Sequence, residues 1–185
     1  MNPTEARSPD APGTLRRRLL FVTPFAPRLD GRHGGSRVMG ELISRLAERH
    51  LVAVAYFRAP GEPDLGELAN VCDRVVQIDQ LWATSLSGVA ARRIRLVAGL
   101  TRGIPLWAGR WTVKGAASLI REVVDSWKPD VVQMEFHLMG QYAPELKGSA
   151  AARVLVEHEP GLPVAEERWR TASGWSRAIA AAVPG

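Results

Sequence analysis

Cysteine is scarce in this chain, which has only Cys72 among its 185 residues. A single thiol excludes an internal disulfide and a cysteine-rich metal site. It also fits a reducing compartment, so we expect a cytoplasmic protein. The histidines His33, His50, His137 and His158 are scattered, and no pair has the spacing of a metal-ligand motif such as HExxH. The sequence therefore predicts no metal site.

Long apolar runs are missing as well. No stretch approaches the ~18 uninterrupted apolar residues of a membrane-spanning helix. The arginines at 16–18 precede a short apolar run, but Pro24 interrupts that run too early for a signal peptide. Residues 1–18 are rich in proline and polar groups, so we expect a disordered leader there and one domain over residues 19–185.

The overall composition is that of a folded protein with a basic surface. Hydrophobic residues make up 46% and charged residues 23% of the chain, which is ordinary for a globular domain. The net charge of +5 fits an anionic partner, whether nucleic acid, a membrane surface or an anionic substrate. Charge alone does not choose among the three.

Strand-like apolar runs alternate with segments of helical periodicity along the chain. The predicted strands are 19–23, 51–57, 74–78, 130–134 and 153–157, and the predicted helical segments are 38–46, 65–72, 88–100, 112–127, 138–146 and 164–183. This alternation predicts an α/β fold, a Rossmann-like doubly wound parallel sheet with helices on both faces.

A glycine loop joins the first strand to the first helix. Gly34 and Gly35 precede the helical pattern, and Ser36 is the expected N-cap. In open α/β sheets ligands bind beyond the carboxyl ends of the strands, and the free amides of a helix N-terminus favour phosphate. A simple turn before a helix is the alternative interpretation.

Two common phosphate motifs do not fit this loop. The Walker pattern requires Gly-Lys-Ser/Thr, whereas the glycine pair is followed by Ser36-Arg37. The dinucleotide fingerprint requires G-x-G-x-x-G directly after the strand, and here about ten residues intervene. The second strand also ends in Arg58 rather than an acid for a ribose, so NAD binding is not expected.

Polar residues gather after two later strands. Glu135 and His137 follow the strand at 130–134, and His158 follows the strand at 153–157. Parallel strands place these ends on the same sheet edge as the glycine loop, where a carboxylate and histidines can do acid–base work. The alternative is that polar groups merely collect where strands reach solvent.

Residues 81–115 combine tryptophan with arginine and lysine and contain no acidic residue. Such a segment suits an anionic bilayer surface, and it could also stack bases or contact phosphates. A helical excursion with buried tryptophans and solvated arginines is the simpler interpretation.

Three of these segments together resemble a known family. They are the Gly34-Gly35-Ser36-Arg37-Val38 loop with its helix, residues 128–136 (KPDVVQMEF), and residues 154–159 (VLVEHE). Their order resembles the N-terminal domain of GT-B glycosyltransferases of the family-4 type, whose corresponding segments read Gly-Gly-small-Arg-Val, Pro-Asp-Val-Val-His-x-His and a strand often ending in His-Asp.

The resemblance implies an acceptor-side domain of a nucleotide-sugar-dependent enzyme that transfers a hexose to a glycan or lipid-linked acceptor without a cofactor. Gly34, Gly35 and Ser36 would approach the donor diphosphate, and Glu135, His137 and His158 would be the catalytic candidates. This sequence has Gln133 and Glu135 where the family has histidines.

The resemblance also implies a second, donor-binding domain. We therefore expect residues 19–185 to be an incomplete N-terminal half, inactive alone, with residues 81–115 in peripheral contact with the inner face of the cell membrane. No specific nucleic acid is expected. The alternative function is a basic, non-catalytic α/β module that binds anionic membrane or nucleic acid.

Overall fold

A computed structural model describes residues 15–80, 111–158, 170–171 and 173. Residues 1–14 of the predicted leader (1–18), the predicted helix at 88–100 and nearly all of the one at 164–183 lie outside this part. The elements are β1 (Arg18–Thr23), α1 (Gly34–Ala47), β2 (Leu51–Arg58), η1 (Gly66–Val71), β3 (Arg74–Asp79), α3 (Ala116–Trp127), β4 (Val131–Glu135), α4 (Phe136–Met139), η3 (Gly140–Leu146) and β5 (Ala152–Val156).

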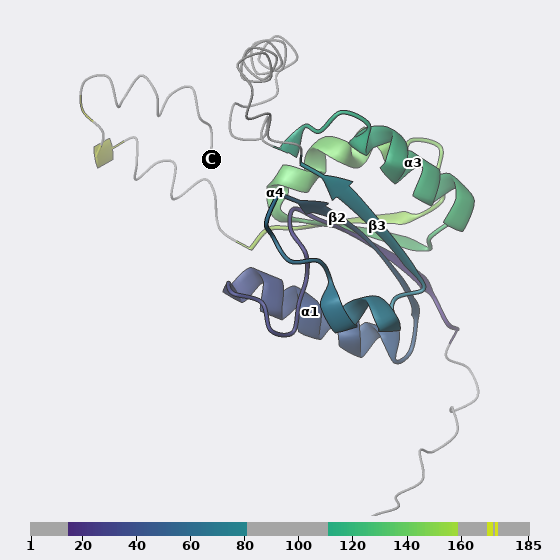
Figure 1. The fold of residues 1–185 in the computed structure, drawn as a ribbon. Helices are drawn as coiled ribbons and strands as arrows, with labels where there is room; N and C mark the ends of the chain where they lie inside the picture. The colour runs from purple at the N-terminus through teal and green to yellow at the C-terminus, as the bar shows by residue number, and fades with distance from the viewer. Residues whose placement is uncertain (1–14, 81–110, 159–169, 172, 174–185) are drawn as a thin grey trace, which may run out of the picture.

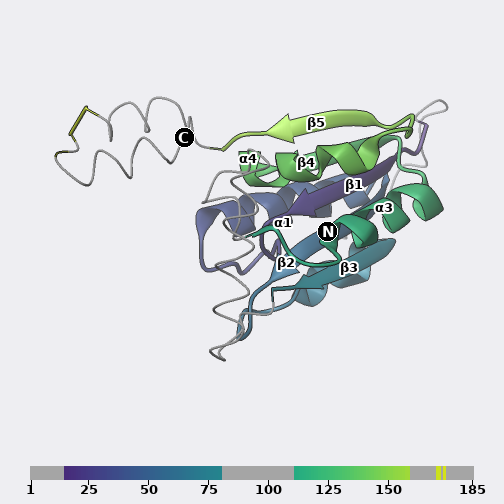
Figure 2. The same cartoon turned by 90° about the horizontal axis from the view of Figure 1, so that it is seen from above.

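The five strands form one parallel sheet in the order β3-β2-β1-β4-β5, with β1 at the centre. α1 and η1 cover one face, and α3, α4 and η3 cover the other (Figure 1). Figure 2 shows the strands fanning out between these two helical layers. The predicted Rossmann-like α/β fold is confirmed.

Successive side chains of each strand point to opposite faces of the sheet, so each face has its own hydrophobic core. In β1, Phe21 packs with Met39 and Ile43 of α1, whereas Leu20 and Val22 pack on the opposite side. The α1 core includes Val52, Val54 and Tyr56 of β2, and the α3 core includes Ala53, Ala55, Phe57, Ile120, Val124, Val132 and Met134. The same alternation puts Gln133 and Glu135 on the α1 face.

Three predicted helices differ from the observed ones. The helix predicted at 112–127 begins only at Ala116, because Gly115 adopts a left-handed conformation with φ of 85°. It ends as predicted, where Lys128 adopts φ of 50° ahead of Pro129. The helix predicted at 138–146 is the short helix α4 continued by the 3-10 helix η3, which contains Pro144. Residues 66–71 are also a 3-10 helix rather than an α-helix.

The loop after β1 lies tightly against the middle of α1. A Cβ built on Gly40 would lie 2.5 Å from the carbonyl carbon of Arg28 and 2.9 Å from the amide nitrogen of Leu29. Both atoms belong to the backbone, so a side chain at this position forces the loop away from the helix. Gly40 therefore sets the spacing between the helix and the loop that leads into it.

We expect Gly40→Ala to lower the free energy of unfolding by about 1–3 kcal/mol through this overpacking. Gly34→Ala is the matched control, because a Cβ there meets nothing within 4 Å and alanine favours a helix over glycine. Urea unfolding of the full chain measures both variants. Equal midpoints for the two variants would contradict the close approach.

Candidate functional site

The strand order reverses between β1 and β4, the two neighbours from which the chain winds in opposite directions. In an open α/β sheet this point marks the crevice where ligands bind. The glycine loop follows β1, and Glu135 is the last residue of β4. The structure thus brings both predicted motifs to the same place.

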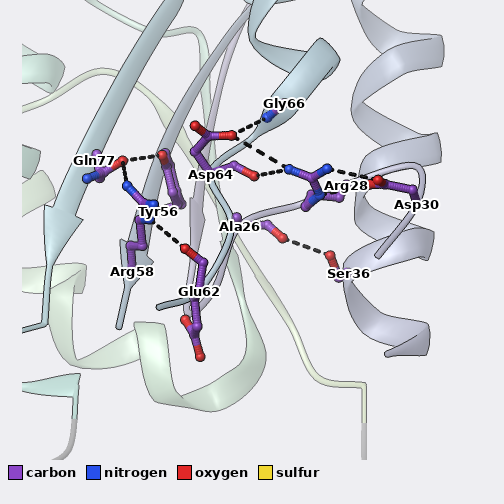
Figure 3. Close-up of polar contacts among 10 residues, drawn as sticks. All are labelled: Ala26, Arg28, Asp30, Ser36, Tyr56, Arg58, Glu62, Asp64, Gly66 and Gln77. Carbon is purple, nitrogen blue, oxygen red and sulfur yellow. Dashed lines mark hydrogen bonds and ion pairs between the residues drawn. The ribbon is translucent and has the colours of Figure 1, made fainter. Parts of the chain in front are cut away.

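The glycine loop is fixed to the start of α1 by Ser36 and His33. The Ser36 hydroxyl is buried and donates a hydrogen bond to the Ala26 carbonyl at 2.7 Å (Figure 3). The backbone N–H of Ser36 donates to Nδ1 of His33 at 3.2 Å, so His33 is the N-cap of α1. The prediction that Ser36 caps the helix is wrong, because the helix begins at Gly34 and its N-cap lies three residues before Ser36.

Gly34 and Gly35 form the first turn of α1. Gly34 is exposed and Gly35 is half-buried. The first amides of an α-helix lack intrahelical acceptors, so they are the donors that an anion can use. A Cβ on Gly35 would lie 3.2 Å from the ring ends of both Phe25 and Phe136, so the absence of a side chain lets both rings pack against Gly35.

A row of aromatic rings connects the glycine loop with β4 and β5. The Phe25 ring meets His33 edge-on at 4.3 Å between centroids and meets Phe136 at 5.3 Å. Phe136 in turn lies 4.3 Å from the His158 ring. Phe136 has φ of 64°, a left-handed conformation that costs a residue with a side chain about 1–2 kcal/mol. Backbone strain of this kind is found at ligand sites.

Glu135 and His158 form a direct pair. His158 Nε2 lies 2.5 Å from Oε2 of Glu135, and Gln133 Nε2 donates to Oε1 at 2.5 Å. The Glu135 side chain is fully buried, whereas the His158 side chain is 24% exposed. A carboxylate only accepts hydrogen bonds, so His158 Nε2 is the donor of this contact when Glu135 is ionised. Glu135 orients the imidazole, and His158 is the member of the pair that reaches solvent.

His137 points to a different partner. Its Nδ1 lies 3.8 Å from Oε1 of Glu157, and its side chain is 34% exposed. Thus the structure joins two of the three predicted catalytic residues and places His137 beside Glu157. Within the part of the chain that the structure describes, no group of histidine, cysteine or acidic side chains could hold a metal ion.

A cleft of about 590 Å³ opens beside the glycine loop, on the side toward β2. That volume falls within the usual range for small-molecule sites. The cleft is lined by Phe25, Ala26, Arg28, Asp30, Gly31, Arg32, His33, Ser36, Arg58, Gly61, Glu62 and Pro63. Glu135 and His158 are not among the lining residues, so the site has a cleft and a separate acid–base pair, with Phe25 and His33 between them.

The charge within this cleft is partly compensated. Arg28 holds Asp30 through two hydrogen bonds, at 2.7 Å from Nε and 2.9 Å from Nη2, and donates from Nη1 to the Asp64 carbonyl at 2.6 Å (Figure 3). This bonding raises the pKa of Arg28 and lowers the pKa of Asp30. Arg28 therefore acts as a clamp between the two loops that form the cleft.

No model of a known protein family matches the sequence, and a search of curated proteins finds no match either. The likeness to GT-B glycosyltransferases therefore rests on the three sequence segments named above. No helix in the described ranges has both the length and the apolar character needed to cross a membrane.

Several site residues carry no sequence signal for their role. Phe25 and Phe136 are ordinary aromatic residues in the sequence, and no pattern indicates the positive φ of Phe136. His33 was one of four scattered histidines until its ring was seen to cap α1. In the sequence, Arg58 only stands where a ribose-binding acid would be expected. The signal that could have located it is its position at the end of β2, on the edge where ligands bind.

We expect Glu135→Gln to switch the neutral tautomer of His158. Gln133 donates to one oxygen of residue 135, so the new amide presents its oxygen there and its NH₂ group to His158. His158 Nε2 must then accept, and its proton moves to Nδ1. Long-range ¹H–¹⁵N NMR correlations of the imidazole nitrogens measure this change.

His50 serves as the internal reference in the same spectra, because its Nδ1 faces the Arg17 amide at 3.4 Å, on another part of the fold. An Nε2 proton on His158 in both proteins would contradict the hydrogen-bond arrangement described here.

Proposed function

We propose that this chain is the acceptor-side domain of a nucleotide-sugar-dependent glycosyltransferase that transfers a hexose to a glycan or lipid-linked acceptor. The observation that supports this most is the meeting of the three family-like segments. The glycine loop, the end of β4 and the residues after β5 come together through Gly35, Phe136 and His158 at the point where the strand order reverses.

The glycine turn suits a diphosphate. The amides of Gly34 and Gly35 lie at the positive end of a 14-residue helix, and neither residue has a side chain to block an approaching phosphate. Ser36 has a different part in this proposal from the one expected from the sequence. Its hydroxyl and its amide are engaged by Ala26 and His33, so Ser36 holds the turn in place while the two glycines bind.

The Glu135–His158 pair supplies the acid–base group of the proposed site. His158 takes the position nearest to solvent and would contact the substrate, exchanging a proton through its imidazole. Glu135 is a positioning residue, because it has no exposed surface and touches the substrate only through His158. His137 is a weaker candidate, since it lies against Glu157.

In this proposal a second Rossmann-like domain supplies most donor contacts. The enzyme would work in the cytoplasm, at the inner face of the membrane. Residues 81–110 lie outside the described part, so the membrane contact remains a prediction. Trp111 of the same segment donates from Nε1 to the Pro24 carbonyl at 3.1 Å, which anchors that end of the segment to the loop after β1.

The test is release of nucleoside diphosphate by the intact enzyme encoded by the whole reading frame, with a panel of nucleotide hexoses and membrane-extracted acceptors. We expect Gly35→Val to raise the KM for the donor at least tenfold. A branched side chain there meets the rings of Phe25 and Phe136 and therefore displaces the turn that carries the amides.

Gly140→Ala is the control, because its Cβ would meet only the Leu155 side chain at an ordinary 3.6 Å. Thermal melting confirms that both variants fold. An unchanged donor KM in Gly35→Val removes the diphosphate role from the loop, and no nucleoside diphosphate release with any donor argues against the enzyme class.

A further inference from the structure

Arg58 is a cationic residue of the cleft with no salt bridge to any carboxylate of the described residues. By the alternation of β2 it lies on the α1 face, in line with Val52, Val54 and Tyr56. Its Nε donates to the Glu62 carbonyl at 2.8 Å, and its Nη1 donates to Oε1 of Gln77 at 3.3 Å. Both acceptors are neutral, so these bonds orient the guanidinium without compensating its charge.

The partner of Arg58 is itself fixed. Gln77 Oε1 also accepts from the Tyr56 hydroxyl at 2.6 Å (Figure 3). Gln77 Nε2 donates to Oδ1 of Asp79 at 2.7 Å. Burial raises the pKa of Tyr56, which keeps its hydroxyl protonated as the donor. Because the network holds the guanidinium before any ligand arrives, binding loses less side-chain freedom than it would at a mobile arginine.

The nearby acids are engaged elsewhere. Asp30 is held by Arg28, Asp79 accepts from Gln77, and Glu62 accepts from the Ala59 amide at 3.0 Å. The side chain of Glu62 runs away from the Arg58 guanidinium in Figure 3. Three arginines line the cleft, Arg28, Arg32 and Arg58. Across the described ranges, no carboxylate forms a salt bridge with Arg32 or Arg58.

We propose that the cleft binds an anionic sugar of the acceptor, with its carboxylate or phosphate on Arg58 and Arg32. Arg58 has two Nη2 hydrogens that no contact within the described residues uses, and a guanidinium edge matches two oxygens of a carboxylate or phosphate. The cleft is large enough for a sugar ring beside the anion. That the bound sugar is an acceptor rests on the proposed function; that the cleft selects an anionic sugar does not.

The experiment is an NMR titration of the full chain, following the amide signals of Gly31 and Gly61, which line the cleft. The probes are D-glucuronate, D-glucose 6-phosphate, neutral D-glucose and inorganic phosphate. We expect at least one of the two anionic sugars to bind tenfold or more tightly than glucose, and more tightly than inorganic phosphate. The first two probes distinguish a carboxylate from a phosphate as the recognised group.

Three variants test whether Arg58 causes the preference for the anionic sugar. Arg58→Gln should remove the preference for the anionic sugar, and Arg58→Lys, which keeps the charge without the fork, should restore part of it. Arg45→Gln is the matched control, because it makes the same charge change at a side chain that is 80% exposed on α1. Thermal melting shows whether each variant is folded.

Equal binding of glucose and both anionic sugars would overturn the proposal, as would equal losses in Arg58→Gln and Arg45→Gln. If inorganic phosphate bound as tightly as glucose 6-phosphate, the cleft would be an anion site in which the sugar ring has no part. These readouts involve no transfer reaction. Anion-selective binding without any glycosyl transfer would therefore support the anion-binding cleft and argue against a glycosyltransferase.

Discussion

The central position of β1 is the constraint on which the rest of the structure depends. β1 pairs in parallel with β2 on one side and with β4 on the other, and its core residues are almost completely buried. Parallel pairing sends all five carboxyl ends to one edge. The loop leaving β1 therefore lies between the loop leaving β2 and the end of β4. A cleft forms on one side of this loop and the Glu135–His158 pair on the other.

The loop after β1 keeps this position because it is bonded at several points. Ser36 ties it to the start of α1 through the Ala26 carbonyl, and Arg28 ties it to the loop after β2 through Asp64. Gly40 lets the loop lie directly on the helix. The charge on Arg28 is compensated by Asp30, so the most strongly bonded arginine of the cleft serves the fold. The less compensated charge of Arg58 remains for a ligand.

The fold could be predicted from the sequence because the spacing of apolar residues indicates which side chains are buried. Each strand of the sheet is a short apolar run, and α1 and α3 have regular apolar faces. The shared edge of the site was also predictable, since it follows from parallel topology. What could not be predicted are contacts that depend on the exact direction of a side chain. Nothing in the sequence says that His33 rather than Ser36 caps α1, or that Glu135 meets His158 and not His137.

The strained backbone at Phe136 explains how the two sides of the site are connected. Glu135 ends β4 with its side chain buried on the α1 face, and the left-handed turn at Phe136 directs the chain at once into α4. This places the Phe136 ring between Phe25 and His158. The rings keep an apolar wall beside an imidazole that is itself held by a buried carboxylate. A fully buried carboxylate is costly unless it is hydrogen-bonded, and Glu135 has two close polar neighbours, Gln133 and His158. The local strain and the buried acid are thus parts of one arrangement, which holds His158 in a single orientation at the edge where the glycine turn presents its amides.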